Sequence, residues 1–443
     1  MESGELVEAF SLLSPSTILV GFIAILFLLT QAWPYLSRQN QVQGSSALAP
    51  TNSERSSQIS VSKEPDVPEG WWSGHDAFEL ERRAIFSKTW IYLAHRSQLT
   101  KAGAYQSFDI AGFPIFLIRG KDDKIRAFHN VCRHRAYTIT RKESGATTVL
   151  GCRYHGWSYD TRGHLVKAPQ FDDVPGFDKS QNGLFEIHAH TTEHGWVFVN
   201  LDAGEPSPFN SSTSSSLRKF ANAARLSSRD TWVTGQTLRG AFNWKLGLSP
   251  RHNEVLKTTL EERASEVLAP SMVTRAARII TQKRGSHECL LSPGTLIYSF
   301  ENVGIWLALT FLPSSATTTQ VRYDLFKSSD CNAAELSKAL EDTVRNLTQQ
   351  IESEFQSLAE TPGSTNQLSG EIDWNTTGTP RLVLDRIQEH AKLEKKRGAQ
   401  ISPAMRQPKA SSLFQKAEQV CKELDCIGGG SQNATLPSGS LAW

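Results

Sequence analysis

This chain has no large excess of positive or negative charge, and it contains little cysteine. The 443 residues include 47 Lys and Arg against 45 Asp and Glu, a formal net charge of +2. The basic residues are scattered along the sequence, which argues against a nucleic-acid binder. The six cysteines form no framework of the kind that staples small secreted domains, so we expect a reducing compartment. The length predicts two domains with appendages.

Charged residues are absent from one N-terminal stretch. Between residues 9 and 37 there is none, and Thr17–Trp33 reads TILVGFIAILFLLTQAW. This run approaches the roughly 20 apolar residues that span a bilayer core. A secretory signal peptide would begin with a basic segment, whereas Glu2, Glu5 and Glu8 are acidic. We therefore predict a single-pass membrane anchor at residues 1–37.

The segment after this anchor is polar. Residues 38–68 are rich in Ser, Gln, Asn and Pro, which predicts a disordered linker. Arg38 is the first basic residue after the apolar run, and by the positive-inside rule it favours a cytosolic body for the protein.

Two short central segments combine cysteine and histidine at metal-ligand spacing. Cys132-x-His134 is followed, after residues 135–151, by Cys152-x-x-His155. Two thiolates on one iron and two imidazoles on the other are the ligands of a Rieske [2Fe–2S] cluster. A zinc site from the same four side chains is the chemical alternative. We predict that these four residues bind a [2Fe–2S] cluster.

The surrounding sequence resembles the N-terminal domain of Rieske non-haem iron oxygenases, of the choline monooxygenase or ring-hydroxylating α-subunit type. The Rieske proteins of cytochrome bc complexes have an extra cysteine in each ligand loop, which these loops do not contain. The resemblance covers about Trp72 to Asp202, in the segments FELERRAIFSKTWIYLAHRSQLTKAGAY, PIFLIRGKDDKIRAFHNVCRHRA, CRYHGWSYDTRGHL and HGWVFVNLD.

Further along, the pattern predicts a sheet and a long helix. Alternating apolar runs at residues 294–315 and 318–326 predict adjacent antiparallel strands, and residues 336–360 have helical periodicity. With the resemblance, this predicts an α+β protein with an N-terminal transmembrane helix, a Rieske β-sandwich domain and a helix-grip domain. The predicted ranges are 69–205 for the Rieske domain, 217–426 for the helix-grip catalytic-type domain and 427–443 for a disordered tail.

The resemblance also implies a mononuclear non-haem iron held by two histidines and one carboxylate. In the family the histidines lie about five residues apart, shortly after an Asn-Trp-Lys sequence. The expected positions here are Leu256 and Glu261, and neither is histidine. The histidines that follow this tripeptide are His252, His287 and His390, and the acids on the predicted late helix include Glu352 and Glu354.

Three interpretations of this mismatch stay open. The iron triad is absent and the chain is an electron-carrying or degenerate relative; or His252 and His287 bind iron in an unusual geometry; or the sequence is altered in this region. In the family a carboxylate also links a cluster histidine to the iron histidine of a neighbouring subunit, which implies a homotrimer. Glu254 lies near the expected place of that carboxylate, and a surface helix acid is its other interpretation.

Two functions follow from these features. The first is a membrane-anchored Rieske-type oxygenase that oxidises a small, lipophilic organic substrate with O₂ and electrons from a reductase or ferredoxin. The second is a Rieske electron-transfer protein, or a catalytically degenerate family member, without the mononuclear iron.

Overall fold

The computed structural model describes residues 70–403 with gaps at 173, 210, 269–285, 292, 301–303, 329–333 and 361–378, and residue 419. The predicted anchor, linker and tail therefore lie outside the described residues. Among the helices of the described part, none is both long and apolar enough to cross a bilayer.

The first domain is a seven-stranded antiparallel sheet with a smaller sheet beside it. The strand order is β1-β10-β9-β4-β3-β2-β5, and the second sheet has the order β6-β7-β8. A short helix α3 (His75–Glu81) and a short π-helix (Arg82–Phe86) precede the sheets. The strands are β1 (Ile91–His95), β2 (Ala104–Ile110), β3 (Phe113–Arg119), β4 (Ile125–His129), β5 (Ser144–Ala146), β6 (Val149–Gly151), β7 (Ser158–Asp160), β8 (Leu165–Lys167), β9 (Glu186–Thr191) and β10 (Trp196–Asn200).

The second domain is a five-stranded antiparallel sheet in the order β11-β15-β14-β13-β12. Helix α4 begins at Ser211, inside the Ser-rich run that precedes this domain in the sequence. The elements are α4 (Ser211–Ala223), β11 (Thr231–Gly240), α5 (Pro250–Leu268), β12 (Ser286–Leu291), β13 (Thr295–Phe300), β14 (Ile305–Ser315), β15 (Thr318–Lys327), α7 (Ala334–Glu360) and α9 (Thr379–Arg397). The predicted strands and the predicted long helix are confirmed.

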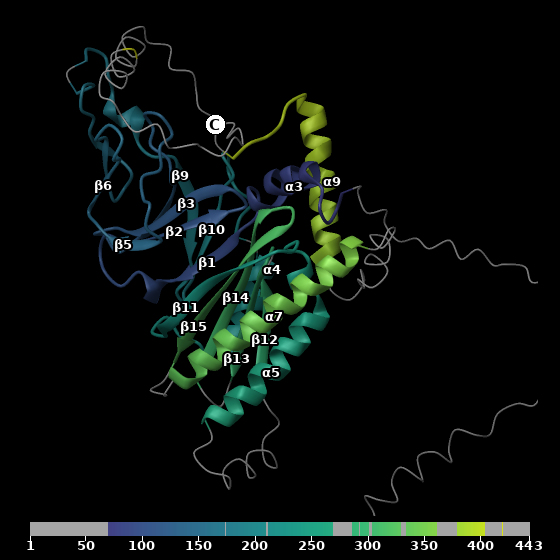
Figure 1. The fold of residues 1–443 in the computed structure, drawn as a ribbon. Coiled ribbons are helices and arrows are strands. Elements are labelled where there is room, and N and C mark those ends of the chain that lie inside the picture. Colours follow the sequence, from purple (N-terminus) through teal and green to yellow (C-terminus); the bar gives the residue numbers. More distant parts are fainter. Residues whose placement is uncertain are drawn as a thin grey trace, which may run out of the picture. The chain divides into compact units, whose positions relative to one another are not determined.

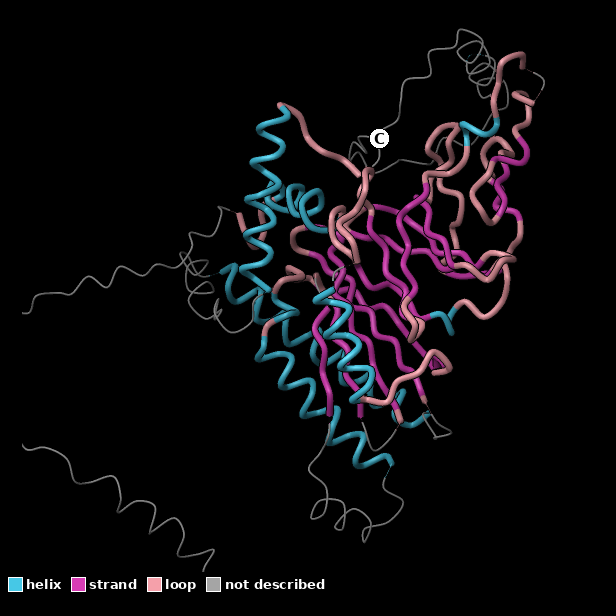
Figure 2. The backbone as a smooth tube through the Cα atoms, turned by 180° about the vertical axis from the view of Figure 1, so that it is seen from behind, coloured by secondary structure: helices cyan, strands magenta, loops and turns pink. Residues whose placement is uncertain are grey.

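Helices α5 and α7 run side by side along this sheet (Figure 1). Apolar residues recur every three or four positions on α7 and form one buried stripe, which is the pattern of a helix with a single core-facing side. The stripe consists of Leu336, Leu340, Val344, Leu347 and Ile351. Viewed from behind, the helices and the strands of the sheet lie against each other along their length (Figure 2).

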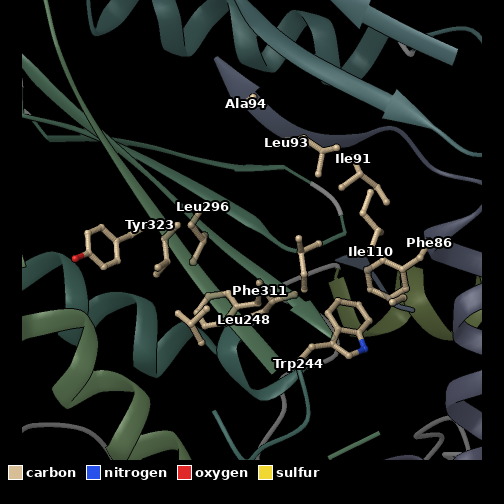
Figure 3. Packing of buried hydrophobic residues seen from close by; sticks show 14 of the residues in the cluster. Phe86, Ile91, Leu93, Ala94, Ile110, Trp244, Leu248, Leu296, Phe311 and Tyr323 are labelled. Carbon is tan, nitrogen blue, oxygen red and sulfur yellow. The ribbon is translucent and has the colours of Figure 1, made fainter. Parts of the chain in front are cut away.

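One cluster of buried apolar side chains includes residues of both the seven-stranded and the five-stranded sheet. Ile91 of β1 belongs to the same cluster as Phe311 of β14 and Leu296 of β13. Figure 3 shows these side chains together with Trp244, which lies close to Phe86. The first domain is therefore packed directly against the second, and the α+β architecture with two β-sheet domains predicted from the sequence is confirmed.

Candidate functional site

Two turns of the same design present the four predicted cluster ligands. In the first turn the Cys132 N–H donates to the Tyr137 carbonyl at 2.8 Å, and the Ala136 N–H donates to the Cys132 carbonyl at 2.9 Å. In the second, the Cys152 N–H donates to the Trp157 carbonyl at 2.7 Å. Each cysteine therefore lies at the start of a hydrogen-bonded loop, with its histidine inside the loop.

The fifth residue of each turn has a left-handed backbone. Ala136 has φ 54° and Gly156 has φ 74°. A Cβ atom at Gly156 would meet the Pro169 ring at 3.3 Å, so glycine relieves both the backbone strain and the crowding there. At Ala136 the same conformation carries a strain of about 1 kcal/mol, which the surrounding hydrogen bonds hold in place.

The loops bring like donors together. The Cys132 and Cys152 thiols interact with each other, and this contact lowers the pKa of the Cys152 thiol. The His134 and His155 rings lie 4.5 Å apart between centroids. The two sulfurs thus form one pair and the two imidazoles another.

This pairing is what a cluster with two thiolates on one iron and two imidazoles on the other requires. A tetrahedral zinc ion would need all four donors to meet at one point. The donor set therefore fits a [2Fe–2S] cluster.

The two histidines differ in exposure. His134 is 1% exposed, and its ring stacks on Trp157 with 5.0 Å between centroids. His155 is half-buried, and its ring lies 3.9 Å from that of Tyr154, which is 47% exposed. One edge of the cluster site is consequently sealed by the core, while the other faces the protein surface.

A buried tyrosine contacts one of the sulfur donors. The Tyr159 hydroxyl lies 3.2 Å from the Cys132 sulfur, and it accepts a hydrogen bond from the Arg133 N–H at 3.1 Å. Burial raises the pKa of Tyr159, so its hydroxyl keeps its proton. A hydrogen bond to a cluster sulfur stabilises the reduced form, and hence this contact is expected to raise the reduction potential.

In the second domain, His252 reaches one carboxylate. Its side chain is 1% exposed. Its Nδ1 lies 3.0 Å from the Leu246 carbonyl oxygen, and its Nε2 lies 2.8 Å from Oε2 of Glu354 on α7. One and two helical turns further along α5, the same buried face carries Leu256 and Leu260.

The other two histidines of this domain do not join His252. Strand pairing places His287 opposite Ser299 and the adjacent Glu288 opposite Tyr298. Glu288 contacts Lys257 of α5 at 3.5 Å, so the alternation of a β-strand directs His287 to the opposite face of the sheet. His390 contacts Glu394 on its own helix at 3.1 Å.

The residues in place therefore do not fit an iron held by two histidines and one carboxylate. His252 supplies one imidazole and Glu354 supplies one carboxylate. One turn further along α5, the buried residue is Leu256, which cannot bind a metal. Glu352 accepts a hydrogen bond from the Ala241 N–H at 2.7 Å instead. Glu254 is exposed, and its role as a bridging carboxylate stays a prediction.

The Asn-Trp-Lys tripeptide has structural contacts. The Asn243 amide donates to the carbonyls of Trp72 and Ala316 at 2.9 and 2.8 Å. The Trp244 indole donates to Glu81 at 2.9 Å, and Lys245 forms an ion pair with the same carboxylate. The sequence did not predict this role of Glu81, because no local spacing pattern connects Glu81 with Lys245, which lies far along the chain.

Comparison with known proteins agrees with the geometry of the loops. Residues 89–178 match the family model described as the Rieske [2Fe–2S] domain. The carnitine monooxygenase oxygenase subunit of Escherichia coli is 36% identical over 136 residues, which cover 31% of this chain and 36% of that protein. The α subunit of 2-aminobenzenesulfonate 2,3-dioxygenase from Alcaligenes is 40% identical over 135 residues, 30% of this chain and 34% of that one. The matched part is thus about a third of the length of these relatives.

Solved structures extend the likeness in fold to both domains. A crystal structure of the quaternary ammonium Rieske monooxygenase CntA has a TM-score of 0.54 at 22% identity, over 68% of this chain and 87% of that one. A naphthalene 1,2-dioxygenase structure has a TM-score of 0.50 at 17% identity, over 66% and 80% of the two chains. Residues 89–178 accordingly match the Rieske [2Fe–2S] domain, and the chain shares its fold with these solved structures over about two thirds of its length.

Proposed function

We propose that this protein is a membrane-attached, Rieske-type oxygenase of the monooxygenase kind. It takes electrons one at a time from a reductase or ferredoxin and uses them, with O₂, to oxidise a small lipophilic organic substrate. The observation that carries the proposal is the pairing of Cys132 with Cys152 and of His134 with His155, on a fold shared with Rieske oxygenases.

The bound cluster supplies reversible one-electron transfer at a potential above that of all-cysteine clusters. Insertion of one oxygen atom into a C–H bond consumes one O₂, two electrons and two protons, and yields an alcohol and water. Two successive reductions of the cluster are therefore needed for each turnover. The buried face of the site keeps water from His134, and the open face at His155 is where electrons enter or leave.

The apolar run Thr17–Trp33 supports attachment to a membrane and a cytosolic body, and it favours a lipophilic substrate. Cell fractionation followed by extraction at alkaline pH tests the attachment. We expect the full chain to stay with the membrane pellet, and a chain that begins at residue 69 to be released. Release of the full chain would contradict the anchor.

A second candidate function is electron transfer without oxygenation. The arrangement around His252 favours it, because only one histidine and one carboxylate meet there and Leu256 occupies the next turn. In that case the cluster would pass its electrons to a separate acceptor.

Metal analysis of the purified full chain separates the two candidates. Three irons per two acid-labile sulfides would support the oxygenase, and two irons per two sulfides would support the carrier. His252→Ala adds a second measurement: substrate oxidation that survives this substitution removes His252 from the reaction, whereas selective loss of oxidation with an intact cluster would place it there.

A further inference from the structure

We propose that the two cluster loops form a docking face for an acidic electron-transfer protein. Residues 130–142 and 151–159 contain no Asp or Glu, although the chain as a whole is nearly neutral. Five basic residues lie on these two short segments. They are Arg133, Arg135, Arg141, Lys142 and Arg153.

Three of these basic side chains are not neutralised by a carboxylate of the described residues. Some basic side chains elsewhere on this domain have carboxylate partners, as in the contact of Arg126 with Asp122 at 2.7 Å. By contrast, Arg141, Lys142 and Arg153 form no ion pair with any residue in the described part of the chain. All three are exposed, so their charges face solvent.

The same three side chains surround one hollow in the surface. A cavity of about 260 Å³ is lined by Arg141, Lys142 and Arg153, together with Tyr105 and Thr147. Like charges around a concave site repel one another, and a carboxylate inserted between them relieves that repulsion. The hollow is therefore suited to an Asp or Glu side chain on a partner surface.

An aromatic contact path connects this face with the cluster. The Arg141 guanidinium lies 5.0 Å from the centroid of the Tyr137 ring. The Tyr137 and Tyr154 rings are 5.3 Å apart, and Tyr154 is 3.9 Å from His155. A protein seated on the cations would thus also cover the exposed side of the cluster site, which is the short route for an electron.

Charge complementarity selects the partner. Opposite charges across an interface steer diffusional encounter and fix orientation, and they do so most strongly for partners that associate briefly. The docking face rests on one part of the proposed function, namely that the cluster takes electrons from a protein donor. The step itself transfers one electron: the reduced donor is oxidised and the oxidised cluster is reduced, with no bond formed or broken.

The test measures reduction of the full, cluster-loaded protein by a reduced plant-type [2Fe–2S] ferredoxin, an acidic one-electron donor. The reduction potential of such ferredoxins lies below the range of Rieske clusters, so the transfer of the electron is downhill. Rapid-freeze EPR distinguishes the two reduced clusters. For Arg141→Glu/Lys142→Glu we expect a second-order rate constant lower by about tenfold or more at low ionic strength, with the difference vanishing at high salt.

Two controls accompany this variant. Lys121→Glu/Lys124→Glu makes the same change in charge on the exposed turn at the other end of β4 and is expected to keep the wild-type rate. Reduced methyl viologen, a cation, should reduce the Arg141/Lys142 variant at least as fast as wild type. Iron and sulfide content shows separately whether the cluster has assembled.

The outcomes are distinct. A chain that assembles no cluster would overturn the proposed function and this inference together. A loaded variant that is reduced by ferredoxin at the wild-type rate, without salt dependence, would overturn the docking face alone. If the variant instead changes the oligomeric state measured by sedimentation while its rate is unchanged, the face is a contact between copies of this chain, and the inference is wrong.

Discussion

The cluster loops and the α5–α7 face are the two places where the sequence resemblance implies metal ligands, and the structure fills them differently. On the loops, four donors are paired, and both turns share the same hydrogen-bond pattern. On the α5–α7 face, His252 is satisfied by Leu246 and Glu354, and leucine occupies the following turns. The comparison indicates that the packing of a fold and the ligation of a metal depend on different residues.

The largest effect is expected from removing a cluster ligand. Cys132→Ala should abolish the cluster, with loss of the visible absorbance and of both iron and labile sulfide, because no other described thiol is paired with Cys152. The matched control is Cys289→Ala, since Cys289 is a buried thiol of the second domain. A normal cluster in Cys132→Ala would remove this residue from the ligand set.

The next largest effect is expected from breaking the buried ion pair between Glu81 and Lys245, the last residue of the Asn-Trp-Lys tripeptide. Lys245 contacts Glu81 and lies 4.5 Å from the Trp71 ring, and both charged side chains are almost fully buried. Lys245→Met leaves Glu81 uncompensated and should lower the free energy of unfolding by about 3–5 kcal/mol. Chemical denaturation of the variant and of the wild type measures this change in the free energy of unfolding.

A double variant checks that interpretation. Glu81→Gln added to Lys245→Met removes the orphaned charge while keeping an acceptor for the Trp244 indole, so most of the loss should be recovered. As a control, Lys257→Met breaks a more exposed contact with Glu288 and should cost less than about 1 kcal/mol. Equal losses at Lys245 and Lys257 would contradict the account.

The interface between the two domains makes stability depend on pH. His95 of β1 packs against Trp306 and Phe326 of the second domain, and burial lowers the pKa of its imidazole from 6.5 to about 4. The unfolded chain therefore binds a proton that the folded chain does not, and stability falls as the pH drops from about 6.5 towards 4. The contribution lost is about 3 kcal/mol.

Unfolding of His95→Gln at pH 7 and at pH 4.5 measures this contribution. The variant should be less stable than wild type at neutral pH and should show a shallower loss of stability on acidification. His164→Gln, at an exposed histidine, serves as the control and should keep the wild-type slope. A slope unchanged by His95→Gln would assign the acid sensitivity elsewhere.

The smallest effect is expected from adding a second histidine to α5, and this change tests the comparison between the two sites most directly. Leu256→His places a second imidazole one turn from His252 on the buried face of α5, in the i, i+4 arrangement that binds metals on helices. With Glu354 opposite, it should tighten binding of Co²⁺ or Zn²⁺ by about tenfold, about 1.4 kcal/mol. Leu260→His, a further turn away, should not; equal affinity in both variants would show that α5 and α7 do not shape a metal site.

The sequence allowed the cluster ligands to be predicted because each cysteine lies in the same short loop as one histidine, where spacing alone determines proximity. The β14 and β15 strands and helix α7 were also predictable, since their periodicity is local. The contact of His252 with Glu354 and the pairing of Lys245 with Glu81 were not, because they join segments more than a hundred residues apart. The face occupied by His287 likewise depends on the strand register, which no local pattern gives.

The contacts of Asn243, Trp244 and Lys245 bear on how such chains are recognised in genomes. These three side chains bind the backbone at Trp72 and the carboxylate of Glu81, so they hold the first domain to the second whether or not any metal follows. A gene that encodes this tripeptide consequently reports that its product can join two modules. Whether that product also carries out oxygen chemistry has to be established from the metal that it binds, and the tripeptide alone does not decide it.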